Sequence, residues 1–313
     1  MLGLVLLILL TALLIAAALL PQGRMRRLAR AATAIAVVAY LASVAGIRIV
    51  ELASRPPDWQ FAECDIGQGD ATVIRSGGEV AVVDVGPDPD LMSACLDDLG
   101  IDRIDLLVLT HYDLDHVGGV DAVVGRVDRA LVGPSADPED DRIRRDLAAA
   151  GAEVDQVARG EVGVLGALDW RVVWPPPSGV EPGNPASVTL QVTAASGCRG
   201  GCLSGLLLGD LGEESQMRLL GLGEVGPIDV VKVAHHGSAD QSDRLYEAIH
   251  ASVGLIGVGA DNDYGHPTSK LLGILAASGT SAYRTDLQGL VLVAPGPEPG
   301  EVEVWTQRHI TVR

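Results

Sequence analysis

Two apolar stretches at the N-terminus differ from the rest of the chain, in which short apolar runs alternate with polar turns. Leu2–Leu20 is almost uninterrupted apolar sequence, long enough to span a bilayer, and Ala31–Gly46 is close to the minimum length for doing so. The segment Pro21–Arg30 between them carries four arginines and is expected to be a loop. The pattern predicts a hairpin of two transmembrane helices over residues 1–55, and the positive-inside rule puts its arginine-rich connection in the cytoplasm. Residues 56–313 then form a second domain, which is extracytoplasmic.

A cleaved signal peptide is the alternative interpretation of the first apolar stretch. Against it, no charged residue precedes the apolar run, and a second apolar stretch follows almost directly. We therefore expect the chain to stay in the cell membrane.

After residue 56, short apolar runs that end in polar residues predict strands, and longer amphipathic runs predict helices. Two or three short strands are expected at the end of the chain. The other predicted strands cover residues 59–64, 71–75, 80–85, 104–109, 129–132, 170–174, 187–193, 204–208, 230–234 and 253–258. The predicted helices cover residues 91–99, 138–150, 213–220, 243–250 and 269–278. Strands mixed with single helices in this way are typical of an α/β sandwich.

The second domain is strongly acidic. Residues 56–313 hold 17 Lys and Arg against 40 Asp and Glu, a net formal charge of −23. Such a surface favours solubility. It opposes binding to nucleic acid, because duplex binding normally depends on Lys and Arg that neutralise phosphates.

The four cysteines fall into two groups. Cys198 and Cys202 are close enough in sequence to form a small disulfide loop, which an extracytoplasmic location would permit. Free thiols are the alternative for this pair. Cys64 and Cys95 are expected to be small buried hydrophobic side chains.

A dense group of metal-capable side chains follows the apolar run Leu106–Leu109, which predicts a buried strand. Val120–Val124 predicts the start of a helix, so the group is expected on a strand-to-helix loop. Its members are His111, Asp113, Asp115 and His116. Two imidazoles and two carboxylates this close would repel one another or lack partners without a cation, and they match the ligands of divalent metals.

The motif His-x-Asp-x-Asp-His-x-Gly-Gly at residues 111–119 resembles the signature of the metallo-β-lactamase fold, with Asp113 where most members carry a second His. Five further stretches agree with that family in order: residues 65–70, 82–86, 207–210, 235–238 and 264–267. Together, over roughly residues 58–295, they resemble the hydrolase domain at the C-terminal end of ComEC-type DNA-internalisation (competence) proteins. The resemblance implies a four-layer αββα sandwich with metal ions at one edge, between the sheets.

The resemblance also implies roles for residues outside the first motif. Asp210 would bridge two metal ions, although it also precedes a predicted helix that it could cap. His266 lies in a Gly-His-Pro turn and would be a ligand, with a surface histidine as the alternative. His235 and His236 end a predicted strand and are expected to point to opposite sides, and the His-x-Ser pattern favours His236 as the one facing the site.

The implied centre holds two divalent ions, zinc or manganese. The first ion would be bound by His111, Asp113 and Asp210, with His236 as a candidate fourth ligand. The second would be bound by Asp115, His116, Asp210 and His266. The family's usual site has one more histidine, but residues 117–209 contain none. The first ion is therefore expected to be richer in oxygen ligands, which makes manganese a candidate beside zinc.

These features predict a hydrolase in which two cations lower the pKa of a shared water to about 7. Asp115 would orient that water, and His235 or His236 would protonate the leaving group. We expect an outward-facing phosphodiesterase or nuclease of ComEC type that acts on DNA during uptake. The alternatives are a hydrolase of a small ester or phosphocholine-like diester, which the acidic surface favours, and a membrane-anchored subunit of a DNA-uptake assembly. Two spanning helices cannot build a DNA channel, so a separate channel subunit is a candidate partner.

Overall fold

The computed structural model describes residues 2–19, 23–196, 198, 201–298 and 300–308. Contacts divide the chain into two compact units, Met1–Arg55 and Pro56–Arg313. The division falls where the apolar N-terminal sequence gives way to the acidic one.

The first unit consists of helices α1 (Leu2–Leu19) and α2 (Arg24–Ser54), which pack against each other. Among the described residues, α2 is the helix that is long and apolar enough to cross a membrane, by length and composition. The prediction of a loop over Pro21–Arg30 is wrong from Arg24 onward, because the arginines begin α2. Arginine, methionine, leucine and alanine all favour helix, and neither Gly nor Pro interrupts the sequence between Gly23 and Gly46. The spanning role of α1 stays a prediction.

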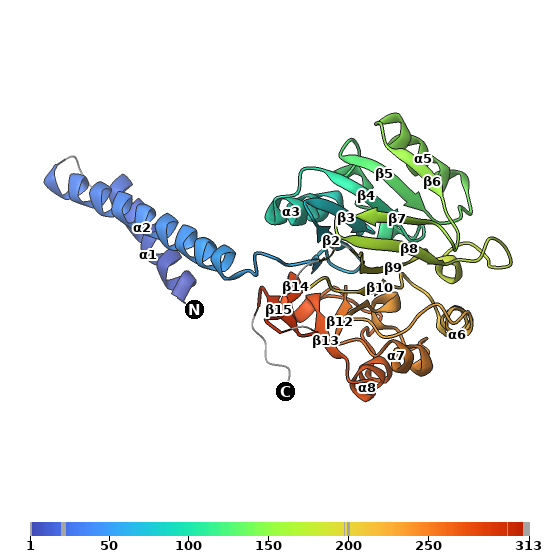
Figure 1. Cartoon of the computed structure of the whole chain (residues 1–313). Helices are drawn as coiled ribbons and strands as arrows, with labels where there is room; N and C mark the ends of the chain where they lie inside the picture. Colours follow the sequence, from blue (N-terminus) through green and yellow to red (C-terminus); the bar gives the residue numbers. More distant parts are fainter. Residues whose placement is uncertain (1, 20–22, 197, 199–200, 299, 309–313) are drawn as a thin grey trace. The chain divides into compact units, whose positions relative to one another are not determined.

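The second unit contains two sheets (Figure 1). The eight-stranded sheet has the order β15-β14-β1-β2-β3-β4-β5-β6, and the seven-stranded sheet has the order β13-β12-β11-β10-β9-β8-β7. The strands of the first sheet are β1 (Phe61–Glu63), β2 (Thr72–Ser76), β3 (Glu79–Val83), β4 (Ile104–Leu109), β5 (Val127–Val132), β6 (Glu153–Gln156), β14 (Val291–Pro295) and β15 (Val302–Thr306). Those of the second are β7 (Val162–Leu165), β8 (Leu168–Trp174), β9 (Thr189–Ala194), β10 (Gly205–Leu207), β11 (Val230–Lys232), β12 (Val253–Ile256) and β13 (Ser281–Arg284).

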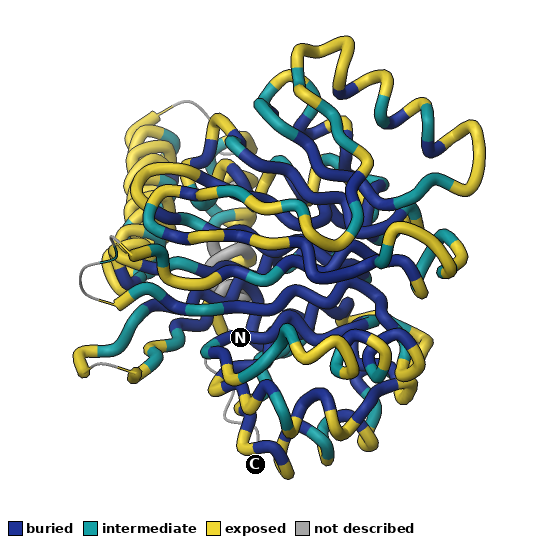
Figure 2. The backbone as a smooth tube through the Cα atoms, turned by 45° about the vertical axis from the view of Figure 1, so that its right-hand side comes forward, coloured by how far each residue is buried: buried dark blue, intermediate teal, exposed yellow. Residues whose placement is uncertain are grey.

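Helices cover the outer faces of both sheets, and burial is concentrated in the strands (Figure 2). The longer helices are α3 (Pro89–Leu99), α5 (Pro138–Ala149), α6 (Glu213–Gly221), α7 (Asp243–Ile249) and α8 (Ser269–Ala277). The short ones are α4 (Leu114–Val117), α9 (Thr285–Gln288) and the 3-10 turns η1 (Val120–Ala122), η2 (Asn184–Ala186) and η3 (Ala234–Gly237).

Three apolar cores separate the layers. One joins α3 and α5 to the first sheet, the second lies between the sheets, and the third joins the second sheet to α6, α7 and α8. The predicted four-layer αββα sandwich is therefore confirmed. Burial of both faces explains why Leu106–Leu109 in β4 is a continuous apolar run rather than an alternating one.

Two disulfides cross-link the second unit. Cys198 and Cys202 are bonded, as predicted. Cys64 and Cys95 were expected only as small buried hydrophobic side chains, but they form a second disulfide with a Cα–Cα distance of 6.0 Å. The pair joins the end of β1 to α3, and only the packing of that helix on the sheet brings the two sulfurs together.

Candidate metal centre

The candidate site lies where several parallel strands end. In the first sheet β3 pairs with β4, and in the second β10 pairs with β11 and β11 with β12, all in parallel. The carboxyl ends of parallel strands meet at one edge, and the loops that leave them converge there. Asp84 and Gly257 follow directly on such strand ends, and His111, Asp210 and His236 come within four residues of one.

The first motif spans the loop after β4 and a short helix. His111 lies in the loop, whereas Asp115 and His116 lie in α4, with Asp113 at its N-cap. The segment after Gly119 is a 3-10 turn rather than the expected longer helix. His111 Nε2 is 3.5 Å from Asp113 Oδ2, and the rings of His111 and His116 are 4.1 Å apart.

His116 is oriented by a carboxylate that the sequence did not single out as a partner. Its Nδ1 is 2.8 Å from Asp84 Oδ2, and Asp84 also accepts hydrogen bonds from the backbone N–H and the hydroxyl of Thr110. Because Asp84 accepts from Nδ1, His116 presents the lone pair of Nε2 to the site. Carboxylate partners of this kind commonly fix the tautomer of metal-binding histidines.

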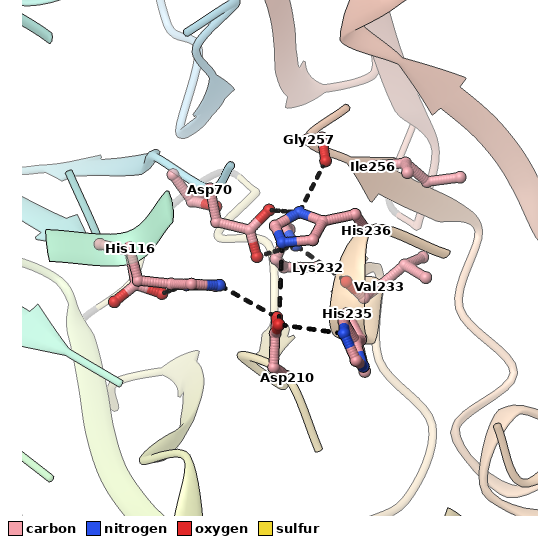
Figure 3. A network of polar contacts seen from close by, with 12 residues as sticks. Asp70, His116, Asp210, Lys232, Val233, His235, His236, Ile256 and Gly257 are labelled. Carbon is pink, nitrogen blue, oxygen red and sulfur yellow. Dashed lines mark hydrogen bonds and ion pairs between the residues drawn. The ribbon is translucent and has the colours of Figure 1, made fainter. Parts of the chain in front are cut away.

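Asp210 lies at the centre of the cluster (Figure 3). Its Oδ1 is 3.2 Å from His116 Nε2, and its Oδ2 is 3.7 Å from Nε2 of both His235 and His236. The carboxylate therefore faces ligand groups from both sheets, as a bridging residue would.

His235 and His236 do not end a strand, so the prediction that they point to opposite sides is wrong. β11 stops at Lys232, and both histidines have left-handed backbone angles, with φ of 51°. Such angles cost roughly 1–3 kcal/mol per residue and persist where the surrounding structure imposes them. Both side chains consequently face Asp210, although His236 is 2% exposed and His235 is 34% exposed.

His236 contacts more site residues than the sequence indicated. Its Nε2 is 3.0 Å from Asp115 Oδ2, while its Nδ1 lies 2.9 Å from the carbonyl oxygen of Gly257 and 3.0 Å from Asp70 Oδ1. Ligand-capable atoms of Asp70, His116, Asp210 and His236 lie within 4.8 Å of one another, and all four residues are buried. The structure thus brings Asp70 to the centre and places His236 beside Asp115 rather than beside His111.

His266 lies next to His235 at the side of the candidate centre. Its ring packs edge-on against His235 at 5.7 Å and stacks with Tyr264 at 5.9 Å. Asn262 holds the turn, because its side chain accepts from the His266 backbone N–H and donates to the His266 carbonyl oxygen.

Unsatisfied polar atoms test whether these residues suit metal ions. Within the described part of the chain, no hydrogen bond satisfies the buried Nε2 of His111, Nε2 of His116 or Oδ1 of Asp210. Buried polar groups normally have partners. Buried imidazole nitrogens and carboxylate oxygens without a hydrogen-bond partner are the donors that a divalent cation would use. The donor set therefore fits divalent metal ions.

Charge coupling within the cluster is strong. Burial alone would raise the pKa of Asp210, but His116 and His236 hold it well below its usual range. Burial alone would lower the pKa of His116, but Asp210 and Asp84 raise it well above 6.5. Burial also lowers the pKa of His236, but Asp70 and Asp115 outweigh burial and raise it to about 10. In the metal-free protein, protons therefore occupy positions that cations could take.

A cleft of about 520 Å³ opens beside Asp210 and His235. Besides Asp210, three acidic residues line it, namely Glu181, Glu214 and Asp240. Arg218 also lines it, donates to the carbonyl oxygen of Gly179 at 3.4 Å and lies 5.2 Å from the Trp174 ring. The cleft therefore adjoins the candidate centre.

Comparisons with known proteins agree with this geometry. The sequence profile of the Metallo-beta-lactamase superfamily matches residues 64–249, more than half of the chain. The chain is 28% identical over 197 residues to ComE operon protein 3 of Bacillus subtilis and 29% identical over 235 residues to Competence protein ComA of Neisseria gonorrhoeae. These alignments cover 61% and 72% of the chain but only 25% and 30% of the two relatives, so the chain spans less than a third of their length.

Among solved structures, the chain is similar to CmlA, a diiron beta-hydroxylase from Streptomyces venezuelae. The TM-score is 0.52 at 19% identity, over 74% of this chain and 53% of CmlA. At this identity the likeness concerns the fold alone.

Proposed function

Because the chain belongs to the metallo-β-lactamase superfamily, we propose that it is a membrane-tethered, dinuclear metal-dependent hydrolase that cleaves phosphodiester bonds of DNA during uptake. The observation that carries the proposal is the position of Asp210, whose carboxylate faces buried imidazoles from both sheets. The two competence proteins among its relatives support the substrate class.

The distances support two ion positions. His111, Asp113 and Asp210 would hold the first ion. Asp115, His116, His236 and Asp210 would hold the second, because His236 Nε2 lies 3.0 Å from Asp115. When bound, two such ions supply a water activated at neutral pH and neutralise charge on a phosphoryl oxygen. The first position includes two carboxylates and one imidazole, so we propose that it accepts manganese as well as zinc.

Three residues of the centre, Asp115, His235 and His266, have chemical roles in this proposal. Asp115 is half-buried, and its carboxylate can orient the attacking water by accepting a hydrogen bond. His235 lines the cleft and faces Asp210, so it can donate a proton to the leaving oxygen. Burial and the neighbouring His235 lower the pKa of His266, so His266 is neutral at pH 7 and available as a hydrogen-bond partner or a ligand.

We further propose that residues 56–313 face outward from the cell membrane. The four arginines at the start of α2 support cytoplasmic placement of that end. Two disulfides with no free cysteine among the described residues support an oxidising compartment. Alkaline phosphatase fused at the C-terminus should be active in cells, whereas a fused cytoplasmic reporter should not. Activity of the cytoplasmic reporter alone would refute the orientation. A separate channel subunit is our candidate partner for the passage of DNA.

The acidic cleft favours a second candidate function. Glu181, Glu214 and Asp240 would repel the flanking phosphates of a nucleic acid strand. A small ester, or a phosphocholine-like diester with a cationic group, would not meet that repulsion. The cleft volume of about 520 Å³ is sufficient for a ligand of that size.

One experiment separates the two functions. The full chain in detergent would be loaded with Mn²⁺ or Zn²⁺ and incubated with single-stranded DNA, duplex DNA and glycerophosphocholine. Cleavage of DNA that disappears in Asp210→Asn supports the nuclease, and turnover of the small diester alone supports the second function. If neither substrate is cleaved although both ions are bound, the role of a membrane-anchored assembly subunit is favoured.

A further inference from the structure

Behind His236 lies a buried group of charged residues for which the proposed mechanism has no use. Glu63, Asp70 and Lys232 are 0%, 2% and 3% exposed. Glu63 ends β1 in one sheet and Lys232 ends β11 in the other, so the group connects the two sheets at the edge that carries the site. Buried charges are rare unless they are paired, so this group requires an explanation.

Lys232 is bound to one of the two carboxylate oxygens of Asp70. Its Nζ donates to Asp70 Oδ2 and, at 2.8 Å, to the carbonyl oxygen of Val233 (Figure 3). Asp70 could itself be taken for a metal ligand, since it lies within 4.8 Å of the other candidates. The ammonium on its second oxygen opposes that role, because a divalent cation on the same carboxylate would be repelled by Lys232.

The free oxygen of Asp70 is directed at the imidazole of His236. Asp70 Oδ1 is 3.0 Å from Nδ1, and the carbonyl oxygen of Gly257 accepts from the same nitrogen at 2.9 Å. Two oxygens on this side keep a proton on Nδ1, which leaves the lone pair on Nε2, the nitrogen that faces Asp115 and Asp210.

Gly257 allows this arrangement. A Cβ at this position would lie 2.6 Å from Asp70 Oδ1 and 2.7 Å from Glu63 Oε1, so any side chain would displace the carboxylates. The close approach of backbone, carboxylates and imidazole is therefore a specific feature of the fold.

We propose that Asp70 and Lys232 are a positioning pair that sets the orientation and tautomer of His236, so that its Nε2 can bind the second ion. This inference rests on the proposed function, because it assumes that the centre binds metal. Neither residue contacts substrate or ion, so both act through His236.

The test measures the metal affinity of the full chain in detergent. A chromophoric chelator that competes for Zn²⁺ reports the affinity of each ion. Co²⁺ in place of Zn²⁺ gives a visible spectrum that reports the ligands of each ion. Asp70→Asn should weaken one of the two ions about 10–100-fold and leave the other unchanged. Lys232→Met should weaken the same ion. The double variant should bind this ion about as tightly as the single variant with the lower affinity, because both changes act through one imidazole. The Co²⁺ bands of the affected ion should shift in intensity or wavelength.

Two controls exclude a general effect of disturbing a buried charge. Glu63→Gln alters the same buried group without contacting His236 and should retain both affinities. Lys232→Arg keeps the charge and should retain most of the affinity that Lys232→Met loses. If Lys232→Met does not fold, Asp70→Asn, which changes the side chain least, decides the question.

The proposal is overturned if Asp70→Asn binds both ions as tightly as the wild type with the same Co²⁺ spectrum, or if Glu63→Gln weakens the same ion equally. A wild-type chain that binds no ion at saturating metal overturns the proposed function, and this inference with it. A wild-type chain that binds two ions with no response to Asp70→Asn overturns this inference alone.

Discussion

The two halves of the candidate centre are supported by very different surroundings. The second half, Asp115, His116 and His236, contains two fully buried imidazoles, each with an oxygen partner on Nδ1 from a distant part of the chain. In the first half, His111 and Asp113, the Nδ1 of His111 approaches only the hydroxyls of Thr110 and Ser187, at 3.1 and 3.4 Å. Asp113 is 58% exposed and faces His111 at 3.5 Å.

This difference predicts that the two ions are bound unequally. A carboxylate that accepts a hydrogen bond from Nδ1 makes Nε2 of a histidine a more basic metal ligand and keeps the ring in place. Burial also strengthens the attraction between a carboxylate and a cation. We therefore expect a tightly held ion in the second half and a weaker, exchangeable one in the first half.

The largest effect is expected where the halves meet. Asp210→Ala should reduce the metal content at both positions, because this carboxylate faces both. Hydrolysis of a phosphodiester should fall at least 10³-fold, since loss of a single electrostatic stabiliser already costs about 10²–10³. Elemental analysis and initial rates would measure the two effects. Asp240→Ala is the matched control, because Asp240 lines the same cleft but does not face the imidazoles, and it should keep both ions. Two ions and full activity in Asp210→Ala would rule out the dinuclear centre.

Substitution of single imidazoles should separate the two halves. His236→Gln should abolish the tighter of two binding events in a chelator titration and leave about one ion per chain, because the second half loses a buried ligand. His111→Gln should abolish the weaker event and leave the tighter one. If His111→Gln instead removes the tighter event, the ranking of the halves is reversed.

The pH dependence of metal binding and of stability should be set by His236, in the second half of the centre. Burial lowers the pKa of His236, but Asp70 and Asp115 raise it to about 10 in the metal-free protein. A proton therefore occupies the ring at neutral pH, so metal binding should release protons and tighten as the pH rises. The raised pKa also stabilises the metal-free fold below pH 6.5, and this stabilisation should be lost as the pH rises through about 10.

Titration calorimetry in buffers of different ionisation enthalpy would count the protons released on metal binding. Chemical unfolding of the metal-free chain across the same pH range would test the stability effect. His236→Gln should flatten both dependences, and unchanged slopes in that variant would assign them to another group.

The smallest expected effect is a gain. Asp113→His should tighten zinc binding in the first half several-fold relative to manganese, because imidazole replaces a carboxylate. Asp113 is exposed, so the substitution should fold normally. Competition between the two metals measured by elemental analysis would show the change, and an unaltered ratio would mean that Asp113 is not a ligand.

The sequence by itself determined much of this picture. Continuous apolar runs marked the interior strands, since burial on both faces leaves no polar positions. The two strands it missed, β6 and β7, are both edge strands, which owe their conformation to pairing with a neighbour. The residues 111–116 could be identified as a metal-binding group because they are adjacent in sequence. Asp210 and His236 could be identified because the stretches that carry them resemble motifs of the family.

Only the tertiary structure decided what supports those ligands. Asp84 is 32 residues from His116 and Asp70 is 162 residues from Lys232, so their pairing depends on which strand ends meet at one edge. The left-handed backbone of His235 and His236 is also imposed by surroundings, because no local preference favours it at a non-glycine residue. Short-range patterns reveal which residues carry chemistry, whereas orientation depends on contacts between segments that are far apart in sequence.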